Sequence, residues 1–501
     1  MKLSDIIYKE EYSSERQIEN IEINSITCAL ADIQNDTLFV IIRSINFDVS
    51  KIINDVINSS PAALICDEEF QVPNTDIPVI RVKNTRKTLP YLFSRFYQID
   101  YSKMRFLAVT GTNGKTSTAT MLTHILRYAG KSVGFIGTGK IEINGVRVTD
   151  LKYSMTTPDP QLLYASIKKM EEADCEFVVM EVSSHALYFD KVLPIPYEIS
   201  IFTNLSPEHM DFHKTMDEYF NTKMKLFTQT KLGIFNMDDK YSRDAMKECK
   251  CEKACIGILQ DADIVARDVI LSGFSGSQYI YREKNRLFKV ILKLGGAFNI
   301  YNSMMALCAA IKLKIKPCIA KAAIGDLDFI DGRMEIIEDA ITVIIDYAHT
   351  EEALKNALKT INAAKKHKQN VTTVFGCGGE RDRQKRPKMA KIAEVYSDAV
   401  IVTSDNPRGE CESDIIKDVL AGFESDAKRS VITSRKAAIT HAILSAKDGD
   451  IIAVIGKGHE RYNIDKNGVH DFDERAVIHA ALKQRKESKH ENYSKLKINV
   501  E

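Results

Sequence analysis

Residues 104–118 read Met-Arg-Phe-Leu-Ala-Val-Thr-Gly-Thr-Asn-Gly-Lys-Thr-Ser-Thr, and this stretch decides the fold of the middle of the chain. Its apolar first half predicts a buried strand, and the Gly-Thr-Asn-Gly-Lys-Thr turn that follows predicts the start of a helix. Gly111 and Gly114 let the backbone curl, so that successive N–H groups face phosphate oxygens at the helix N-terminus. Lys115 supplies a positive charge for the β- and γ-phosphates, and the Thr116 hydroxyl is placed to hold Mg²⁺.

The turn departs from the strict P-loop pattern at Val109, where that pattern has its first glycine. An ordinary strand-to-helix turn is the alternative interpretation. The strand before the turn, the helix after it and the Lys-Thr pair together favour a nucleoside triphosphate site. We therefore expect ATP to bind the residues of the turn: Gly111, Thr112, Asn113, Gly114, Lys115, Thr116 and Ser117.

The composition is that of an ordinary globular protein. The chain has 501 residues, of which 44% are hydrophobic and 27% charged, which is enough for about three domains. A net charge of +1 argues against a nucleic-acid surface. No apolar run reaches the ~18 residues that cross a bilayer, and no secretory h-region is present. We expect a cytoplasmic monomer with small-molecule substrates, no nucleic acid and no membrane contact.

Ten cysteines are scattered along the chain, and three of them cluster at Cys249, Cys251 and Cys255. Their C-x-C-x₃-C spacing fits no common zinc module, and no histidine lies nearby in the sequence. We expect reduced, mostly packed thiols, as is usual in a cytosolic protein.

Alternating strand and helix patterns predict an α/β chain of three domains. The predicted bounds are 1–98 for a small N-terminal α/β domain, 99–332 for a central P-loop-type ATPase domain with a parallel sheet, 333–485 for a C-terminal Rossmann-like domain, and 486–501 for a frayed polar tail.

Several strands and helices within these domains can be placed from hydrophobic periodicity. In the first domain, strands are expected at 37–42 and 62–66, with a helical stretch near 50–58. In the last, strands at 341–345, 371–375, 399–403, 430–433 and 450–455 alternate with helices near 351–365, 387–397, 412–423 and 435–446. This alternation is typical of a doubly wound parallel sheet.

Polar residues follow two further apolar strands of the central region. Glu181 comes directly after the strand 177–180, and the strand 199–203 leads into Asn204-Leu-Ser-Pro-Glu-His-Met-Asp-Phe-His213. Ligands of open parallel sheets lie at the carboxyl ends of the strands. A carboxylate and an imidazole there suit a divalent cation that bridges phosphate oxygens. Alone, His209 would be read as a structural histidine; beside a phosphate loop and Glu181, a metal ligand is favoured.

Nine motifs occur in the same order as in the Mur ligases, ATP-dependent amide ligases of peptidoglycan precursor synthesis. They are residues 110–117, 156–160, 180–185, 204–213, 296–302, 332–335, 346–349, 376–381 and 456–460. The chain resembles this family strongly over 104–475 and weakly over 1–98, which corresponds to the domain that takes the UDP-linked substrate. The resemblance implies that ATP phosphorylates a carboxylate and that an amine then attacks the acyl phosphate.

The resemblance also implies roles for individual residues. Lys115, Glu181, His209 and Lys223 correspond to catalytic residues, and two Mg²⁺ would be held by Thr116, Glu181, His209 and a carbamylated Lys223. A solvated helix lysine is the plain alternative for Lys223, and Lys225 competes for the role. Asn299 and Asn302 resemble adenine contacts, Asp346 the ribose carboxylate with His349 nearby, and Arg333 the linker arginine that reaches the nucleotide when the domains close.

The residues for the amine acceptor are Arg381, Asp405, Asn406, Pro407, Arg408, Gly456 and Glu460 by the same resemblance. Asp405-Asn-Pro-Arg408 goes with meso-diaminopimelate in the family. A guanidinium fork pairs with the distal carboxylate of diaminopimelate, whereas it would repel the distal ammonium of lysine. Asn-Pro is also a turn starter, and both interpretations can hold together.

The side of the acyl substrate departs from the family. Thr156, Thr157 and Ser183 match peptide contacts. The family's Asp-Ser-Arg, Asp-Gly-His and Gln-x-Arg signatures are represented here by Asn24-Ser-Ile26, Asn46-Phe-Asp48 and Phe189-Asp-Lys191. Loss of an arginine at an anion site is not conservative, so Lys191 is a weaker match.

Three functions remain open from the sequence. The first is a divergent ligase that adds meso-diaminopimelate to the D-glutamate carboxylate of UDP-N-acetylmuramoyl-L-Ala-D-Glu. The second is a paralogous ligase that joins a diaminopimelate-like amine to a different carboxylate. The third, a binding or regulatory protein with a degenerate site, is disfavoured because the catalytic residues are all present.

Overall fold

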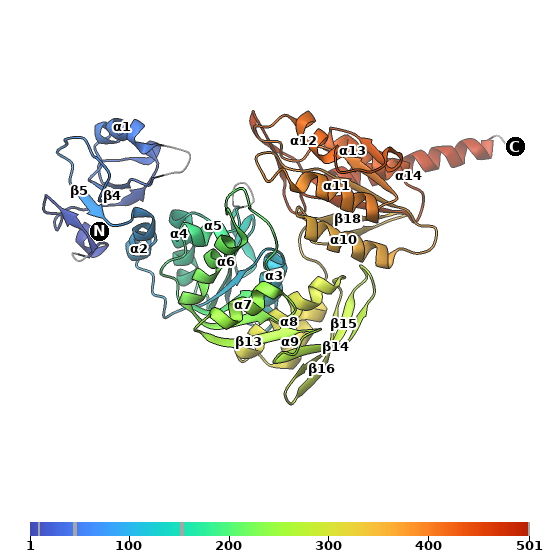
Figure 1. Ribbon diagram of the computed structural model, residues 1–501, viewed down its shortest axis with the longest axis horizontal. Helices are drawn as coiled ribbons and strands as arrows, with labels where there is room; N and C mark the ends of the chain where they lie inside the picture. The colour runs from blue at the N-terminus through green and yellow to red at the C-terminus, as the bar shows by residue number, and fades with distance from the viewer. Residues whose placement is uncertain (9–10, 44–47, 151–154, 499–501) are drawn as a thin grey trace.

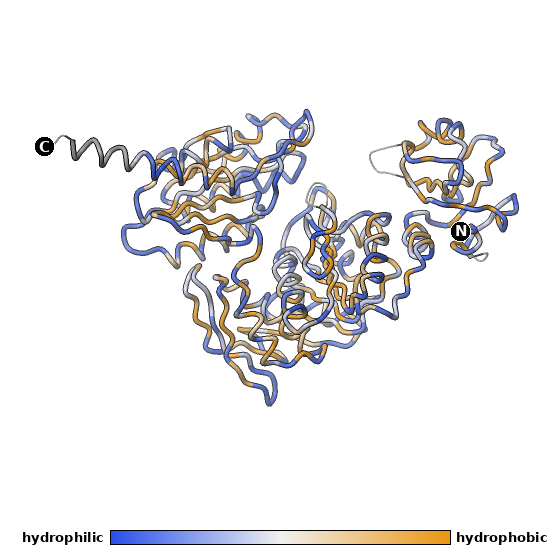
Figure 2. Tube along the Cα trace, turned by 180° about the vertical axis from the view of Figure 1, so that it is seen from behind, coloured by the Kyte–Doolittle hydropathy of each residue, from blue (hydrophilic) through white to orange (hydrophobic). Residues whose placement is uncertain are grey.

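The computed structural model describes residues 1–8, 11–43, 48–150 and 155–498, and it has a mixed α/β fold. Three large sheets follow one another along the chain, each with its own helices (Figure 1). Hydrophobic segments are concentrated on the strands and the helix faces that cover them (Figure 2). The predicted α/β fold class is confirmed. The sheets span residues 13–82, 105–292 and 335–455.

The N-terminal unit has a five-stranded sheet in the order β1-β5-β4-β3-β2. Its strands are β1 (Ser13–Ser14), β2 (Ser25–Thr27), β3 (Thr37–Val40), β4 (Ala63–Asp67) and β5 (Val79–Val82), and its helices are α1 (Ile53–Asn58) and α2 (Thr85–Phe96). Only β1 pairs antiparallel. Leu92 and Phe93 of α2 pack in the same hydrophobic cluster as Leu163 of the central unit, which fixes the two units together.

The central unit has an eleven-stranded sheet in the order β16-β15-β14-β13-β12-β11-β6-β10-β7-β8-β9. The strands are β6 (Arg105–Thr110), β7 (Val133–Gly137), β8 (Lys140–Ile143), β9 (Val146–Asp150), β10 (Phe177–Glu181), β11 (Tyr197–Phe202), β12 (Thr230–Asn236), β13 (Glu252–Gly257), β14 (Ile264–Leu271), β15 (Ser277–Glu283) and β16 (Arg286–Leu292). The helices are α3 (Lys115–Tyr128), α4 (Pro160–Glu172), α5 (Ser184–Tyr188), α6 (Met216–Met224), α7 (Lys240–Glu248), α8 (Ala297–Lys312) and α9 (Pro317–Asp326).

The middle of this sheet is parallel, as expected, but both of its ends are antiparallel. The neighbouring strands β14-β13-β12-β11-β6-β10-β7 all pair in parallel. The hairpins β7-β8-β9 and β14-β15-β16 extend the sheet beyond the predicted parallel part. Alternate residues of β6 point to opposite faces. Leu107 and Val109 pack with α3 and α8, while Phe106 and Ala108 pack with α4.

The C-terminal unit is a doubly wound domain, as the alternating pattern predicted. Its sheet has the order β17-β18-β22-β19-β20-β21, and only β17 pairs antiparallel. The strands are β17 (Glu335–Glu338), β18 (Thr342–Asp346), β19 (Val371–Phe375), β20 (Ala399–Val402), β21 (Arg429–Val431) and β22 (Ile451–Ile455), followed by the hairpin β23 (Tyr462–Asp465) and β24 (Gly468–Asp471). Helices α10 (Glu351–Ala364), α11 (Lys385–Tyr396) and α12 (Glu412–Leu420) cover one face, and α13 (Arg435–Ser445) and α14 (Glu474–Ile498) the other.

The C-terminal stretch differs from the expected frayed tail. Helix α14 continues to Ile498 and projects away from the sheet (Figure 1). Lysine and glutamate have high helix propensity, and pairs four residues apart support a helix, as Lys483 and Glu487 do at 3.9 Å. Among the helices of the described residues, none is long and apolar enough to cross a membrane.

Candidate active site

The phosphate loop lies between β6 and α3, and its two glycines are required by the backbone. Gly111 has φ +142°, and a Cβ there would lie 1.9 Å from Thr203 Oγ1. Gly114 has φ +84°, and its Cβ would lie 2.5 Å from Asn302 Oδ1. L side chains rarely adopt these conformations, so neither position tolerates one without strain.

The loop is held in shape by the segment that follows β11. Asn113 N donates to Asn204 Oδ1 at 2.9 Å, and Asn204 Nδ2 donates back to Asn113 O at 3.0 Å. Thr203 Oγ1 also donates to Asn113 O at 2.7 Å. These hydrogen bonds hold the loop in a curled conformation, and ordering a loop in advance lowers the entropic cost of binding.

Two lysine amines meet at one backbone carbonyl of the loop. Lys115 Nζ and Lys223 Nζ each donate to Gly111 O at 3.0 Å, and Lys115 Nζ also donates to Thr112 O at 2.8 Å. Lys223 is 1% exposed and lies over the Tyr219 ring. Burial lowers the pKa of Lys115, and burial together with the charge of Lys115 holds the pKa of Lys223 well below its usual value.

Lys225, the competing candidate, lies elsewhere. Its Nζ pairs with Asp190 at 3.1 Å, and its side chain is 46% exposed. The structure therefore brings Lys223, and not Lys225, to the phosphate loop.

Glu181 is fully buried at the end of β10 and faces Thr116. Thr116 Oγ1 donates to Glu181 Oε2 at 2.9 Å, and Thr138 donates through N and Oγ1 to the two Glu181 oxygens at 2.9 and 3.1 Å. Arg333 Nη2, from the start of the C-terminal unit, donates to Thr116 Oγ1 at 3.2 Å. This contact links the phosphate loop to the linker arginine expected to reach the nucleotide.

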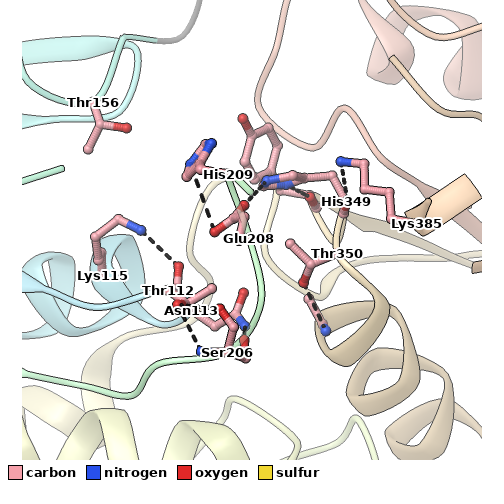
Figure 3. A network of polar contacts seen from close by, with 12 residues as sticks. Thr112, Asn113, Lys115, Thr156, Ser206, Glu208, His209, His349, Thr350 and Lys385 are labelled. Atoms are coloured by element: carbon pink, nitrogen blue, oxygen red, sulfur yellow. Dashed lines mark hydrogen bonds and ion pairs between the residues drawn. The ribbon is translucent and has the colours of Figure 1, made fainter. Parts of the chain in front are cut away.

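A second contact between the units joins Glu208 and His349. Figure 3 shows Glu208 between His209 and His349, with the amine of Lys115 directed toward Thr112 of the loop. His349 Nε2 lies 2.8 Å from Glu208 Oε1, and the other ring nitrogen lies 3.0 Å from Tyr347 O. Burial alone would raise the pKa of Glu208, but His209, His349 and Lys115 hold it well below its usual value. Burial lowers the pKa of His209 to about 4.

Glu208 was not singled out from the sequence. The signal was its place beside His209 in the polar segment after β11.

A cavity of about 120 Å³ adjoins the loop at the side expected for the nucleoside. Asn302, Arg333 and Asp346 line it, and so does Asn204, the polar residue that follows the strand 199–203. Asn236, Tyr301 and Asn356, which the sequence did not single out, line it as well. Asn299 does not line this cavity. Its Nδ2 donates to Gly295 O at 2.8 Å, and its Oδ1 accepts from Asn302 Nδ2 at 3.2 Å, so that Asn299 orients Asn302.

Asp346 has both carboxylate oxygens occupied by backbone N–H groups. Oδ2 accepts from Met334 N at 2.7 Å, and Oδ1 accepts from Ala348 N at 2.8 Å. Burial raises the pKa of Asp346. The carboxylate is thus held at the cavity wall by the turn that also carries Arg333.

Most of the phosphate loop and the predicted acceptor residues other than Pro407 line a single cavity of about 270 Å³, which we call the reaction cavity. Its wall includes Thr112–Thr116 and Thr156 from the central unit, and His349, Arg381, Asp405, Asn406, Arg408, Gly456 and Glu460 from the C-terminal unit. Ser117 lines the cavity of about 120 Å³ instead. Residues from distant parts of the sequence are therefore brought together at one place.

A buried lysine, Lys457, lies among the side chains of the predicted amine-acceptor residues Asp405, Asn406 and Glu460. Lys457 is 0% exposed, and its Nζ donates to Asn406 Oδ1 at 2.9 Å and lies 3.5 Å from Asp405. Asn406 Nδ2 donates to Glu460 Oε2 at 2.8 Å. Burial would raise the pKa of Asp405, but Lys457 and Arg435 hold it below its usual value. Lys457 was missed from the sequence, although it lies inside the motif 456–460.

Arg408 and Arg381 are two of the cations of the C-terminal unit that line this cavity, together with Arg333, Lys385 and Lys388. Arg408 Nη1 donates to Gly379 O at 2.8 Å and to Asn406 O at 3.3 Å, and Gly379 packs tightly on the carbonyl of Pro407. Burial and the nearby charge of Arg381 lower the pKa of Arg408. Neither guanidinium forms an ion pair with a carboxylate in the part of the chain that the structure describes. Two neighbouring unpaired guanidiniums form a site for an anion.

The predicted peptide contacts divide between two places. Thr156 lines the reaction cavity and accepts from Thr138 Oγ1 at 3.2 Å. Thr157 Oγ1 donates to Glu181 O at 2.9 Å and accepts from Ser183 N at 3.1 Å, so both residues brace the end of β10. Lys191 lies away from the reaction cavity and pairs with Asp159 at 2.6 Å.

Of the altered signatures, Asn24 donates to Asp36 at 2.8 Å and Ile26 is buried in the core. Residues 46 and 47 of the second segment, Asn46-Phe-Asp48, lie outside the described residues.

Thr116 and Glu181 fit a hard divalent cation, because a hydroxyl and a carboxylate oxygen converge at 2.9 Å. Within the described ranges, no group of three His, Cys, Asp or Glu side chains is placed to hold a metal ion, and this includes the cluster Cys249, Cys251 and Cys255. Further Mg²⁺ ligands would have to come from phosphate, hydroxyl or carbamate oxygens. All the cysteines are free thiols.

Two family models match the chain. The model described as Mur ligase middle domain matches residues 109–310, and the model described as Mur ligase, glutamate ligase domain, matches residues 332–458.

Curated relatives are similar over nearly the whole chain. A UDP-N-acetylmuramoyl-L-alanyl-D-glutamate–2,6-diaminopimelate ligase from Bacillus cereus is 37% identical, covering 93% of this chain and 95% of the relative. An enzyme of the same name from Geobacillus kaustophilus is 35% identical, covering 90% and 93%.

Solved structures with a similar fold include other ligases. A ligase of that name has a TM-score of 0.66 at 26% identity and covers 94% of this chain and 97% of its own. A MurF ligase from Thermotoga maritima in complex with ADP shares the fold, with a TM-score of 0.60 at 17% identity, covering 94% of this chain and 99% of its own.

Proposed function

The chain belongs to the Mur ligase family, and we propose that it adds meso-diaminopimelate to the D-glutamate carboxylate of UDP-N-acetylmuramoyl-L-alanyl-D-glutamate with ATP. The family predicted from the motifs is confirmed, and the protein is an ATP-dependent, ADP-forming ligase. The observation that carries the proposal is the single cavity that is lined by both the phosphate loop and the unpaired Arg381 and Arg408.

The reaction has to bring the negatively charged carboxylate of the substrate to the negatively charged triphosphate of ATP. The loop N–H groups and Lys115 hold the phosphates of ATP, so the substrate carboxylate can attack the γ-phosphate and release ADP. The amine then attacks the carbonyl carbon of the acyl phosphate, and phosphate leaves as the amide forms. The contacts Arg333–Thr116 and His349–Glu208 keep the two units together and so help to exclude water from this intermediate.

We propose that Thr116, Glu181 and His209 hold Mg²⁺, with Lys223 supplying a carbamate for a second ion. The metal would neutralise charge between ATP and the attacking carboxylate. Burial lowers the pKa of Lys223, so its amine is available in the neutral form that adds to CO₂. The carbamate is an anion and would remove the repulsion between Lys223 and Lys115 at the carbonyl of Gly111.

We propose that the nucleoside of ATP enters the cavity lined by Asn302 and Asp346. An amide both donates and accepts, as an adenine edge requires, and a carboxylate suits the ribose hydroxyls. Asn299 serves this site by orienting Asn302.

We assign diaminopimelate as the amine acceptor from the charges of the residues that line the cavity. Arg408 and Arg381 offer two guanidiniums to the distal carboxylate of diaminopimelate, while Glu460 and Asp405 suit its ammonium groups. Lysine would place an ammonium against Arg408.

We also propose domain bounds near residues 98 and 332, where the chain passes from one sheet to the next. One chain lines the whole reaction cavity, so a cytoplasmic monomer would suffice for the activity.

The second candidate is a paralogue with a different acyl substrate. It is favoured by one observation: Lys191, in the position of a family arginine, is already neutralised by Asp159. An assay of phosphate release that crosses several acids with several amines distinguishes the two. Turnover that requires UDP-muramyl dipeptide and diaminopimelate supports the first, whereas equal turnover with uridine-free glutamyl peptides supports the second.

A further inference from the structure

Two cavities lie where the N-terminal unit meets the central unit, away from the reaction cavity. One has a volume of about 910 Å³ and is open, and the other has a volume of about 310 Å³. They share two lining residues, Arg86 of α2 and Phe189, which directly follows α5. Arg86 therefore faces both cavities.

Arg86 is fixed in place by contacts from both units. Its Cζ lies 4.6 Å from the centroid of the Phe189 ring, and its Nη2 donates to the carbonyl of Arg43. Stacking on an aromatic ring orients a guanidinium plane and leaves its edge for hydrogen bonds. Burial lowers the pKa of Arg86, because its charge is partly removed from water.

Arg86 differs from the other cations of these cavities in forming no ion pair with a described residue, although the charge of Asp67, which pairs with Arg43, opposes the lowering of its pKa by burial. The others are in ion pairs: Lys225 with Asp190 at 3.1 Å, Lys191 with Asp159 at 2.6 Å, and Arg43 with Asp67 at 3.6 Å. No carboxylate among residues 1–8, 11–43, 48–150 and 155–498 forms an ion pair with Arg86. A half-buried guanidinium that has no ion-pair partner is stabilised when an anion binds to it.

The position of Arg86 is connected to the reaction cavity by two short stretches of chain. Thr156 lines the reaction cavity, and Asp159 lines the smaller cavity only three residues later. Helix α5 begins beside Ser183, which contacts Thr157, and ends beside Phe189. A five-residue helix is about 7.5 Å long. One extended substrate can therefore reach from the phosphate loop to Arg86.

We propose that Arg86 binds the diphosphate of the acyl substrate and so replaces the arginine that the segment Phe189-Asp-Lys191 lacks. A guanidinium fork matches two phosphate oxygens, whereas the paired Lys191 and Lys225 have no free charge to offer. The assignment rests on the proposed function, since it takes the acyl substrate to carry a nucleoside diphosphate.

The test is steady-state kinetics of Arg86→Gln in the full-length chain, with ATP and diaminopimelate saturating. The KM for UDP-N-acetylmuramoyl-L-Ala-D-Glu should rise at least about tenfold, while kcat and the KM values for ATP and diaminopimelate change less than about twofold. Arg86→Lys, which keeps the charge and loses the fork, should give an intermediate KM. Lys225→Gln removes a paired cation of the same cavity and is the matched control, with a KM near that of the wild type.

A second substrate separates anion binding from a structural effect. With N-acetylmuramoyl-L-Ala-D-Glu, which carries no diphosphate, Arg86→Gln and the wild type should have the same kcat/KM. An equal loss with both substrates, or an unchanged KM for the UDP-linked one, would overturn the assignment while leaving the proposed function standing. Absence of wild-type turnover with the UDP-linked substrate would overturn both.

Discussion

Lys223, on α6, donates a hydrogen bond of 3.0 Å to the carbonyl oxygen of Gly111 in the phosphate loop, 112 residues earlier in the chain. The same carbonyl accepts from Lys115. A buried amine at this position is next to the place where phosphate charge will lie, and its depressed pKa keeps it reactive toward CO₂. The relationship makes Lys223 the residue through which the carbamate proposal can be tested.

Lys223→Ala should lose most of its turnover, and short-chain carboxylates such as acetate or propionate should restore part of it. The added carboxylate would take the place of the missing carbamate anion. The measurement is ADP release against carboxylate concentration, with Lys225→Ala as the matched control because that side chain is exposed and paired with Asp190. An inactive Lys223→Ala that no carboxylate restores would count against the carbamate.

Lys115→Ala should lower kcat by at least about 100-fold, because the variant removes a positive charge aimed at the transferred phosphoryl group. The loop itself is braced by Asn113 and Asn204, so the variant should keep the thermal unfolding midpoint of the wild type to within a few degrees. Normal turnover in a folded Lys115→Ala would refute the assignment of the phosphate loop.

Arg408→Ala should raise the KM for diaminopimelate by about 10- to 100-fold, the range that corresponds to losing a charge-assisted hydrogen bond of 1.5–3 kcal/mol. The KM for ATP should not change, since Arg408 is bound to Gly379 and Asn406 on the acceptor side. The variant should also discriminate less against lysine as the amine. An unchanged KM for diaminopimelate would remove the argument for this acceptor.

Sequence periodicity predicted the local elements well, because a buried strand or an amphipathic helix is decided by nearby residues. The strands at 371–375 and 450–455 and the helix at 351–365 fall on β19, β22 and α10. The hairpin strands β14–β16 were missed. Ile270, Leu287 and Ile291 on them are exposed, so their pattern is not that of a buried parallel strand.

The site was predictable where one motif carried the chemistry, as at Gly111–Ser117, and less so where contacts cross the chain. Glu208 contacts His349, 141 residues away, and Lys457 organises Asn406, 51 residues away. Arg86 belongs to no motif, and the aromatic ring against which its guanidinium lies is that of Phe189, in a different unit. Such pairings depend on tertiary packing, which periodicity does not report.

The pair Arg386–Glu410 predicts a pH dependence of stability in the C-terminal unit. The hydrogen bonds from Arg386 lower the pKa of Glu410 from 4.5 to about 2. Because the folded pKa is depressed, the pair stabilises the unit above about pH 4.5 and loses its contribution as the pH falls toward 2. Hydrogen exchange of β19 amides should show a stability difference between the wild type and Glu410→Gln that is full at pH 6 and shrinks below pH 4.5. A difference independent of pH would contradict this assignment.

The most direct test of the account is phosphate release by the purified protein with ATP, UDP-N-acetylmuramoyl-L-Ala-D-Glu and meso-diaminopimelate, with the product identified by mass spectrometry. The account predicts one phosphate per amide formed, a product that joins the acid and the amine, and no release when either is left out. Phosphate release that does not depend on the amine, or no amide with any pair of acid and amine, would contradict it.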